Sequence, residues 1–298
     1  MGKVISTERE IFMPNPDLKA VNAKVKYLKN RWPIYSEIID WMAELLPELY
    51  KAEERVVLPR CPWESVRSER FGREIPLFDG RSIPLDMESV RALYPTLVAM
   101  TEVRRGKLQG LGEMLQFPPD DLENILRAVL ASETKEVESL CSRRGADPSL
   151  FTLLMRLAAK PSLRRLSKLA EAEVAFSSWS KGFCPVCGSW PGLARLGEGE
   201  KPRTLFCSLC DTSWVFPNLK CPFCENNRPE ELTYLFAEEE KDLRLDLCER
   251  CGQGLRTFDM KYHAAPVLPL LDELVTSHLV LAAANGAKPT DHPPGAVS

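Results

Sequence analysis

The chain has 298 residues, of which 44% are hydrophobic and 27% are charged, and its formal net charge is −3. This composition is ordinary for a globular protein and excludes an extensively disordered chain. The N-terminal residues lack the apolar stretch of a secretory signal, and no apolar run approaches the ~20 residues that span a bilayer. We therefore expect a cytoplasmic protein without stable membrane insertion.

Residues 1–180 have the apolar spacing of a mostly α-helical domain. Pro33 can open the second helix, and Pro47 is expected to kink or end it. Proline and glycine make 56–88 an irregular connection. We expect Pro161 to separate the last two helices of this part. Helical spacing is found in segments 18–28, 34–49, 90–100, 122–129, 137–140, 154–158 and 163–174.

From Gly182 onward, cysteines and short β-type runs replace the helical spacing. Strands are predicted at 204–206, 212–216, 232–236, 243–247 and 255–258. The composition predicts a multidomain α+β fold, in which a helical domain precedes two small four-cysteine modules and a C-terminal helix. The predicted parts are a helical domain (1–180), a first module (181–218), a second module (219–262), a C-terminal helix (263–285) and a disordered tail (286–298).

Eight of the ten cysteines form four Cys-x-x-Cys pairs. In a chain without a secretion signal, this spacing favours metal ligation over disulfide bonds. A two-residue gap lets both sulfurs of a tight turn point at one ion, and two such turns complete a tetrahedron. We expect Cys184, Cys187, Cys207 and Cys210 to hold one ion. The second set is Cys221, Cys224, Cys248 and Cys251. Interleaved pairing, first pair with third, stays open.

Zinc and a rubredoxin-type iron both suit a tetrahedron of four sulfurs. Closed four-cysteine sites are usually structural, because no position is left for substrate. Metal-free structural cysteines are the weaker alternative, since two such small units would almost lack a core. Redox dithiols are also weaker, because no clear helix opens behind any of the pairs.

The charge of the cysteine-rich part argues against a nucleic-acid surface. Between Lys181 and Met260 there are ten Lys or Arg and thirteen Asp or Glu, a balance of −3. Two divalent ions held by eight thiolates would bring this to about −7, whereas nonspecific nucleic-acid affinity needs clustered cations. No phosphate loop, nucleophile elbow or His-Glu-x-x-His motif is present, so we predict no enzyme.

Some other residues have plainer expected roles. Cys61 and Cys141 are expected to be small buried apolar side chains. Trp190 and Trp214 follow the first two pairs and are expected to pack over a small core, with partner contact as the sharper alternative. His263 is a candidate outer neighbour of the second module.

Longer stretches around the cysteines resemble one family. They run from Phe183 to Gly192 (FCPVCGSWPG), Leu205 to Trp214 (LFCSLCDTSW), Leu219 to Cys224 (LKCPFC), Leu247 to Gln253 (LCERCGQ) and Leu271 to Leu274 (LDEL). Together they resemble the formate dehydrogenase accessory protein FdhE family over about residues 180–280. The tail Lys288–Ser298 departs from the family pattern.

The resemblance implies a cytoplasmic, chaperone-like bacterial factor with two rubredoxin-like metal modules, with iron as the associated metal and zinc able to occupy the same ligands. It implies contact with the catalytic subunit of respiratory formate dehydrogenase before that subunit is exported, and no dehydrogenase activity of its own. Two alternatives stay open: an iron–thiolate redox protein acting on a client enzyme, and a nucleic-acid-binding zinc-ribbon protein.

Overall fold

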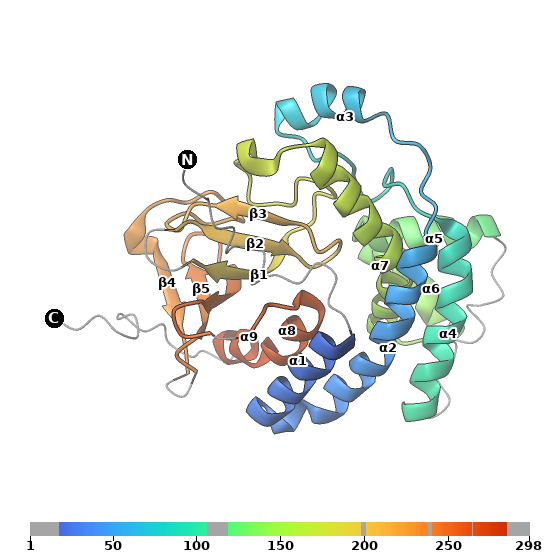
Figure 1. Cartoon of the computed structure of the whole chain (residues 1–298), viewed down its shortest axis with the longest axis horizontal. Coiled ribbons are helices and arrows are strands. Elements are labelled where there is room, and N and C mark those ends of the chain that lie inside the picture. The colour runs from blue at the N-terminus through green and yellow to red at the C-terminus, as the bar shows by residue number, and fades with distance from the viewer. Residues whose placement is uncertain (1–17, 106–118, 198–200, 238–239, 264, 285–298) are drawn as a thin grey trace, which may run out of the picture. The chain divides into compact units, whose positions relative to one another are not determined.

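Helices fill most of the N-terminal part and a sheet with two cysteine clusters follows, so the predicted fold class is confirmed (Figure 1). The computed structural model describes residues 18–105, 119–197, 201–237, 240–263 and 265–284. Their contacts divide the chain into two compact units. Of the described residues, those within 1–40, 177–184 and 189–298 form the sheet unit, and those within 41–176 and 185–188 form the helical unit.

The helical unit is built from amphipathic helices whose apolar faces meet in one core. Helix α4 packs along α7, and α5 and α6 pack against α7 and against each other. Leu97, Leu126 and Phe151 are fully buried between these helices. The helices are α2 (Ser36–Arg55), which enters this unit at residue 41, α3 (Trp63–Glu69), α4 (Met87–Arg105), α5 (Pro119–Leu130), α6 (Thr134–Arg144) and α7 (Pro148–Glu173), with a 3-10 turn at Phe71–Arg73.

The prolines inside α2 and α7 do not end these helices. Helix α2 continues through Pro47, and α7 continues through Pro161, where a break between two helices was expected. A proline inside a helix costs roughly 3 kcal/mol. Around Pro161, the side chains of Leu157 and Leu163 are buried, and each contributes roughly 1.5–3 kcal/mol. Burial therefore outweighs the lost hydrogen bond. The connection predicted to be irregular also contains α3.

The sheet has six strands in the order β3-β2-β1-β6-β5-β4. Strands β1 to β3 follow the first cysteine pair and flank the second, and β4 to β6 follow the third pair and flank the fourth. The parallel pairing of β1 with β6 joins these halves into one sheet. Strand β1 was not predicted. The strands are β1 (Pro191–Leu196), β2 (Arg203–Cys207), β3 (Ser213–Phe216), β4 (Leu232–Leu235), β5 (Leu243–Cys248) and β6 (Gly254–Asp259).

Three helices of the sheet unit gather on one side of the sheet: α1 (Leu18–Arg31), α8 (Pro269–Val275) and α9 (Ser277–Ala284) (Figure 1). Arg256 of β6 donates to the Glu273 carbonyl of α8 at 2.7 Å, which identifies the covered face. Because side chains alternate along a strand, the opposite face carries Arg244 and Asp246 of β5. This second face bears the functional features described below.

Buried ion pairs tie α1 to the rest of the sheet unit. The Lys24 ammonium lies 2.8 Å from an Asp272 carboxylate oxygen, and both side chains are 1% exposed. Arg31 donates two hydrogen bonds of 2.5 Å to Asp242, which also bonds the imidazole Nδ1 of His263 at 2.6 Å. Burial opposes ionisation of Asp242, but His263 and Arg31 outweigh it and hold the pKa of that carboxyl well below its usual range.

His278 makes the stability of the sheet unit depend on pH. His278 of α9 bonds Glu240 at 2.8 Å, and this bond raises the pKa of His278 against the opposing effect of burial. A histidine with a raised pKa in the folded state stabilises the fold at low pH, and this contribution disappears as the pH rises through that pKa. We expect wild type to lose up to about 1 kcal/mol relative to His278→Gln between about pH 6 and 8.

Chemical unfolding of wild type and His278→Gln at several pH values measures this difference. His263 is kept in both proteins, so it does not contribute to the comparison. Parallel stability curves across this pH range would contradict the assignment to His278.

Within the described residues, no helix is long and apolar enough to cross a lipid bilayer.

Candidate metal centres

All four Cys-x-x-Cys pairs adopt the same turn, which we call a knuckle. In each, the first cysteine's N–H donates to the carbonyl five residues on, at 2.7–3.1 Å. The residue after the second cysteine has a positive φ in every knuckle, at 60–73°: Gly188, Asp211, Glu225 and Gly252. Glycine adopts this conformation without steric cost, so Gly188 and Gly252 are a signal that the sequence itself carries. Asp tolerates this conformation through local bonding and Glu does so rarely, so their positions carried no comparable signal.

The knuckles bring the cysteines together as two groups, the first of Cys184, Cys187, Cys207 and Cys210, the second of Cys221, Cys224, Cys248 and Cys251. Within each group the four sulfurs lie within 4.8 Å of one another. The first and second knuckles form one group, and the third and fourth form the other, which is the sequential arrangement rather than the interleaved one.

The distances between sulfurs suit a tetrahedral ion. The Cys184 and Cys210 sulfurs are 3.5 Å apart, and the Cys221–Cys251 and Cys224–Cys248 pairs are 3.7 Å apart. Four ligands at ~2.3 Å in a tetrahedron place sulfurs ~3.8 Å from each other, whereas a disulfide needs ~2.05 Å. The geometry of the donor atoms therefore fits a metal ion in each group.

Hydrogen bonds to sulfur support thiolate character. In the first group, the backbone N–H groups of Leu209 and Cys210 point at the Cys207 sulfur at 3.4 and 3.5 Å. The Thr212 hydroxyl lies 2.9 Å from the Cys210 sulfur. In the second group, the Asn226 amide points at the Cys248 sulfur at 3.7 Å. Such donors stabilise a charged sulfur.

Two thiols of the second group differ in their acidity. Burial raises the pKa of Cys221 to about 12. Burial also opposes ionisation of Cys248, yet the backbone N–H of Cys251 and the Asn226 amide lower the pKa of Cys248 to about 7. Of these two thiols, Cys248 is therefore the one that more readily supplies a thiolate at neutral pH.

Contacts within the helical unit fix the turn of the first knuckle. The backbone N–H groups of Leu77 and Phe78 donate to the Pro185 and Val186 carbonyls at 2.8 and 2.9 Å. A side chain at Gly188 would meet the Pro76 ring at 3.1 Å. Residues of the connection between α3 and α4 thus hold the turn that carries Cys187.

Residues that flank the first knuckle contact the third knuckle, which belongs to the other group. A Cβ atom built on Gly182 would lie 1.9 Å from the Pro222 carbonyl oxygen, so only glycine fits in front of the first knuckle. The ring centroids of Trp190 and Phe223 are 5.5 Å apart, and the two ring planes are tilted relative to each other. Trp190 is 47% exposed, so its predicted role in packing is only partly met; Trp214 is buried, as predicted.

The remaining candidates lie elsewhere. Cys141 is buried as expected, but the expectation for Cys61 is wrong because its side chain is partly exposed. Burial raises the pKa of the Cys141 thiol to about 11. The partner of His263 is the Asp242 carboxylate rather than a cysteine. The tail 286–298 lies outside the described residues.

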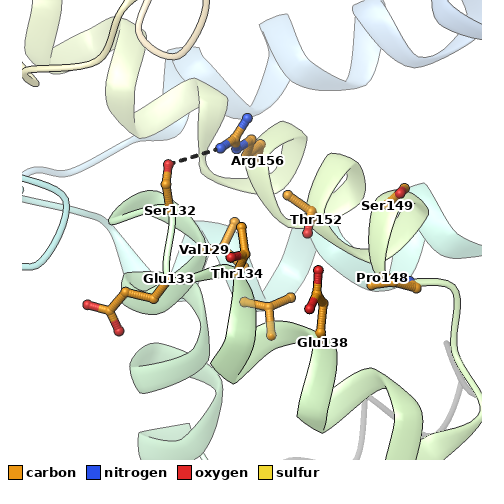
Figure 2. A pocket seen from close by; sticks show the side chains of 10 residues that line it. Val129, Ser132, Glu133, Thr134, Glu138, Pro148, Ser149, Thr152 and Arg156 are labelled. Carbon is orange, nitrogen blue, oxygen red and sulfur yellow. Dashed lines mark hydrogen bonds between the residues drawn. The ribbon is translucent and has the colours of Figure 1, made fainter.

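Two cavities of the described residues lie near these elements. One of about 240 Å³ lies beside the second group, and Cys221 and Cys248 belong to its lining. The other, of about 450 Å³, lies between α5, α6 and α7 of the helical unit. Figure 2 shows its lining, in which Arg156 donates to the Ser132 hydroxyl at 3.5 Å. This second cavity has neither cysteine nor histidine in its lining.

Comparison with known proteins gives one consistent set of relatives, although no family model matches the chain. It is 27% identical over 155 residues to the FdhE homolog of Aquifex aeolicus, covering 50% of this chain and 54% of that protein. It is 27% identical over 185 residues to FdhE of Salmonella typhimurium, covering 61% and 56%. The chain thus spans about half the length of the curated relatives that it matches.

The fold also has a solved counterpart. The crystal structure of the FdhE protein from Pseudomonas aeruginosa matches with a TM-score of 0.68 and 20% identity, covering 94% of this chain and 95% of that one. This match shows the same fold. Together with the curated relatives, it confirms the resemblance to the FdhE family that the cysteine-rich stretches indicated.

Proposed function

We propose that this chain, a relative of FdhE proteins, is a non-enzymatic accessory factor for the maturation of formate dehydrogenase in the cytoplasm. The observation that carries the proposal is the coincidence of two independent likenesses. The four knuckles and their flanks resemble the FdhE family, and the fold matches an FdhE crystal structure over 94% of the chain. In this role the protein binds the catalytic subunit before its export.

The eight cysteines hold two metal ions in this proposal, one in each group. Iron and zinc both suit four thiolates, and the spacing of the sulfurs fits either ion. A bound ion supplies rigidity to a small unit that has little core of its own. The knuckles then keep their loops fixed, and these loops present the exposed Trp190 and the half-buried Phe223 to a partner.

A capture experiment tests the proposal. Immobilised full-length protein is mixed with the purified catalytic subunit of formate dehydrogenase, and the retained subunit is quantified. We expect capture by wild type, loss of capture by Cys248→Ser, and unchanged capture by Cys61→Ser, because Cys61 lies outside both groups. No capture by wild type, or equal capture by all three proteins, would contradict the proposal.

One observation favours a second role, an iron–thiolate redox protein acting on its client. Cys224 and Cys251 of the second group are partly exposed, so an electron donor or acceptor can approach their sulfurs. A visible iron–thiolate absorption that bleaches on reduction and recovers on oxidation would support this role. A colourless zinc-loaded protein that still captures the subunit would exclude it.

A further inference from the structure

The two groups differ in how well their sulfurs are shielded. In the first group, Cys187 is 5% exposed and the other three cysteines are 0% exposed. In the second group, Cys221 and Cys248 are buried, but Cys224 and Cys251 are only partly so. Ligand exchange at a metal needs an incoming donor atom to reach the ion, so a difference in shielding becomes a difference in exchange rate.

The second group also adjoins a cavity. Its volume is about 240 Å³, and it lies on the sheet face opposite α8, under the loop of the third knuckle. Leu219 and Phe223 of that loop form part of its wall, and Cys221 and Cys248 line it directly. The two cysteines that are buried from the surface therefore adjoin a space large enough for a small molecule.

Cations surround this cavity. Arg203, Arg244 and Lys220 line it, against one carboxylate, Asp246. Asp246 lies 3.2 Å from Arg203 and 2.7 Å from Arg244, and Glu225 pairs with Lys220 at 3.1 Å. Four thiolates around a divalent ion carry a net charge of about −2, which repels an anion. The cations offset that repulsion along this approach.

We propose that the second group is the exchangeable centre of the protein, and that small anionic thiols reach it through this cavity. The first group keeps its ion. In the exchange, a thiolate from solution forms a bond to the ion while one cysteine–metal bond breaks. The released cysteine sulfur takes a proton from solvent, and no electron is transferred. The inference rests on the proposed metal occupancy of both groups.

The experiment follows zinc release from the full-length protein loaded with two zinc ions. Mercaptoacetate is the thiol, and a chromophoric chelator reports each ion as it leaves. We expect two phases, with one equivalent in a fast phase whose rate rises with thiol concentration. Alkylation at the end of this phase, read by mass spectrometry, should label Cys221, Cys224, Cys248 and Cys251 and spare the first group.

The charge of the cavity is tested by substitution and by choice of thiol. Lys220→Glu should slow the fast phase with mercaptoacetate by about tenfold. Lys261→Glu, a matched change at an exposed lysine outside the cavity lining, should leave it unchanged. The thiolate of 2-mercaptoethanol carries one negative charge, whereas that of mercaptoacetate carries two. Compared at equal thiolate concentration, 2-mercaptoethanol should react more slowly than mercaptoacetate in wild type and should be less sensitive to Lys220→Glu.

The outcomes separate this inference from the proposal on which it rests. Protein that binds no zinc would overturn the metal occupancy itself. Two ions released in one phase, early labelling of the first group, or equal rates for mercaptoacetate and 2-mercaptoethanol in wild type would overturn the inference alone.

Discussion

Replacement of Cys248 by serine is expected to release the ion of the second group and to unfold strands β4 to β6. Binding of a structural zinc ion contributes roughly 10–16 kcal/mol in small four-ligand units, so loss of one thiolate removes much of the energy that folds this half of the sheet. Elemental analysis should find one ion per chain, and circular dichroism should show loss of strand signal.

The parallel pairing of β1 with β6 extends this effect beyond the second group. Leu193 of β1 pairs with Arg256 of β6, so unfolding of β6 exposes an edge of the first half. We therefore expect Cys248→Ser also to lower the melting temperature of the half that keeps its ion. Cys61→Ser provides the control. Two ions per chain in Cys248→Ser would show that Cys248 is not a ligand.

Replacement of Lys24 by methionine is expected to destabilise the sheet unit by about 3–5 kcal/mol, because it leaves the buried Asp272 carboxylate without its cation. Lys24 also donates to the Pro266 carbonyl at 2.9 Å, and this bond is lost as well. Chemical denaturation, followed by the fluorescence of the tryptophans, measures the change.

Helix α1 offers a matched control for this substitution. Lys29 pairs with Asp40 at 2.8 Å, but these side chains are 36% and 37% exposed. Lys29→Met should therefore cost less than about 1 kcal/mol. Lys24→Met combined with Asp272→Asn should recover part of the loss, since the unpaired charge is gone. Equal effects of Lys24→Met and Lys29→Met would contradict the role given to the buried pair.

The knuckles could be predicted because their information is local. Two cysteines separated by two residues indicate a tight turn whatever the surrounding fold. The flanking β-type runs predicted β2 to β6. Strand β1 was missed because Pro191 and Gly192 are poor strand formers. Its position comes from pairing with β6, more than sixty residues along the chain, which single-sequence patterns do not reveal.

The same limit applies to the ion pairs of α1. The sequence places Lys24 and Arg31 on a helix, where they look like ordinary surface cations. Their partners Asp272 and Asp242 lie more than two hundred residues away. The cavity beside the second group was equally hidden, because Arg203 and Asp246 meet only when β2 and β5 join the same sheet.

The presence of an ion in each cysteine group is the central claim, and elemental analysis of purified full-length protein tests it most directly. We predict about two ions per chain, iron or zinc, with the eight cysteines of the two groups protected from alkylation until the ions are removed. A metal content near zero, with these eight thiols freely reactive in the native protein, would contradict the claim.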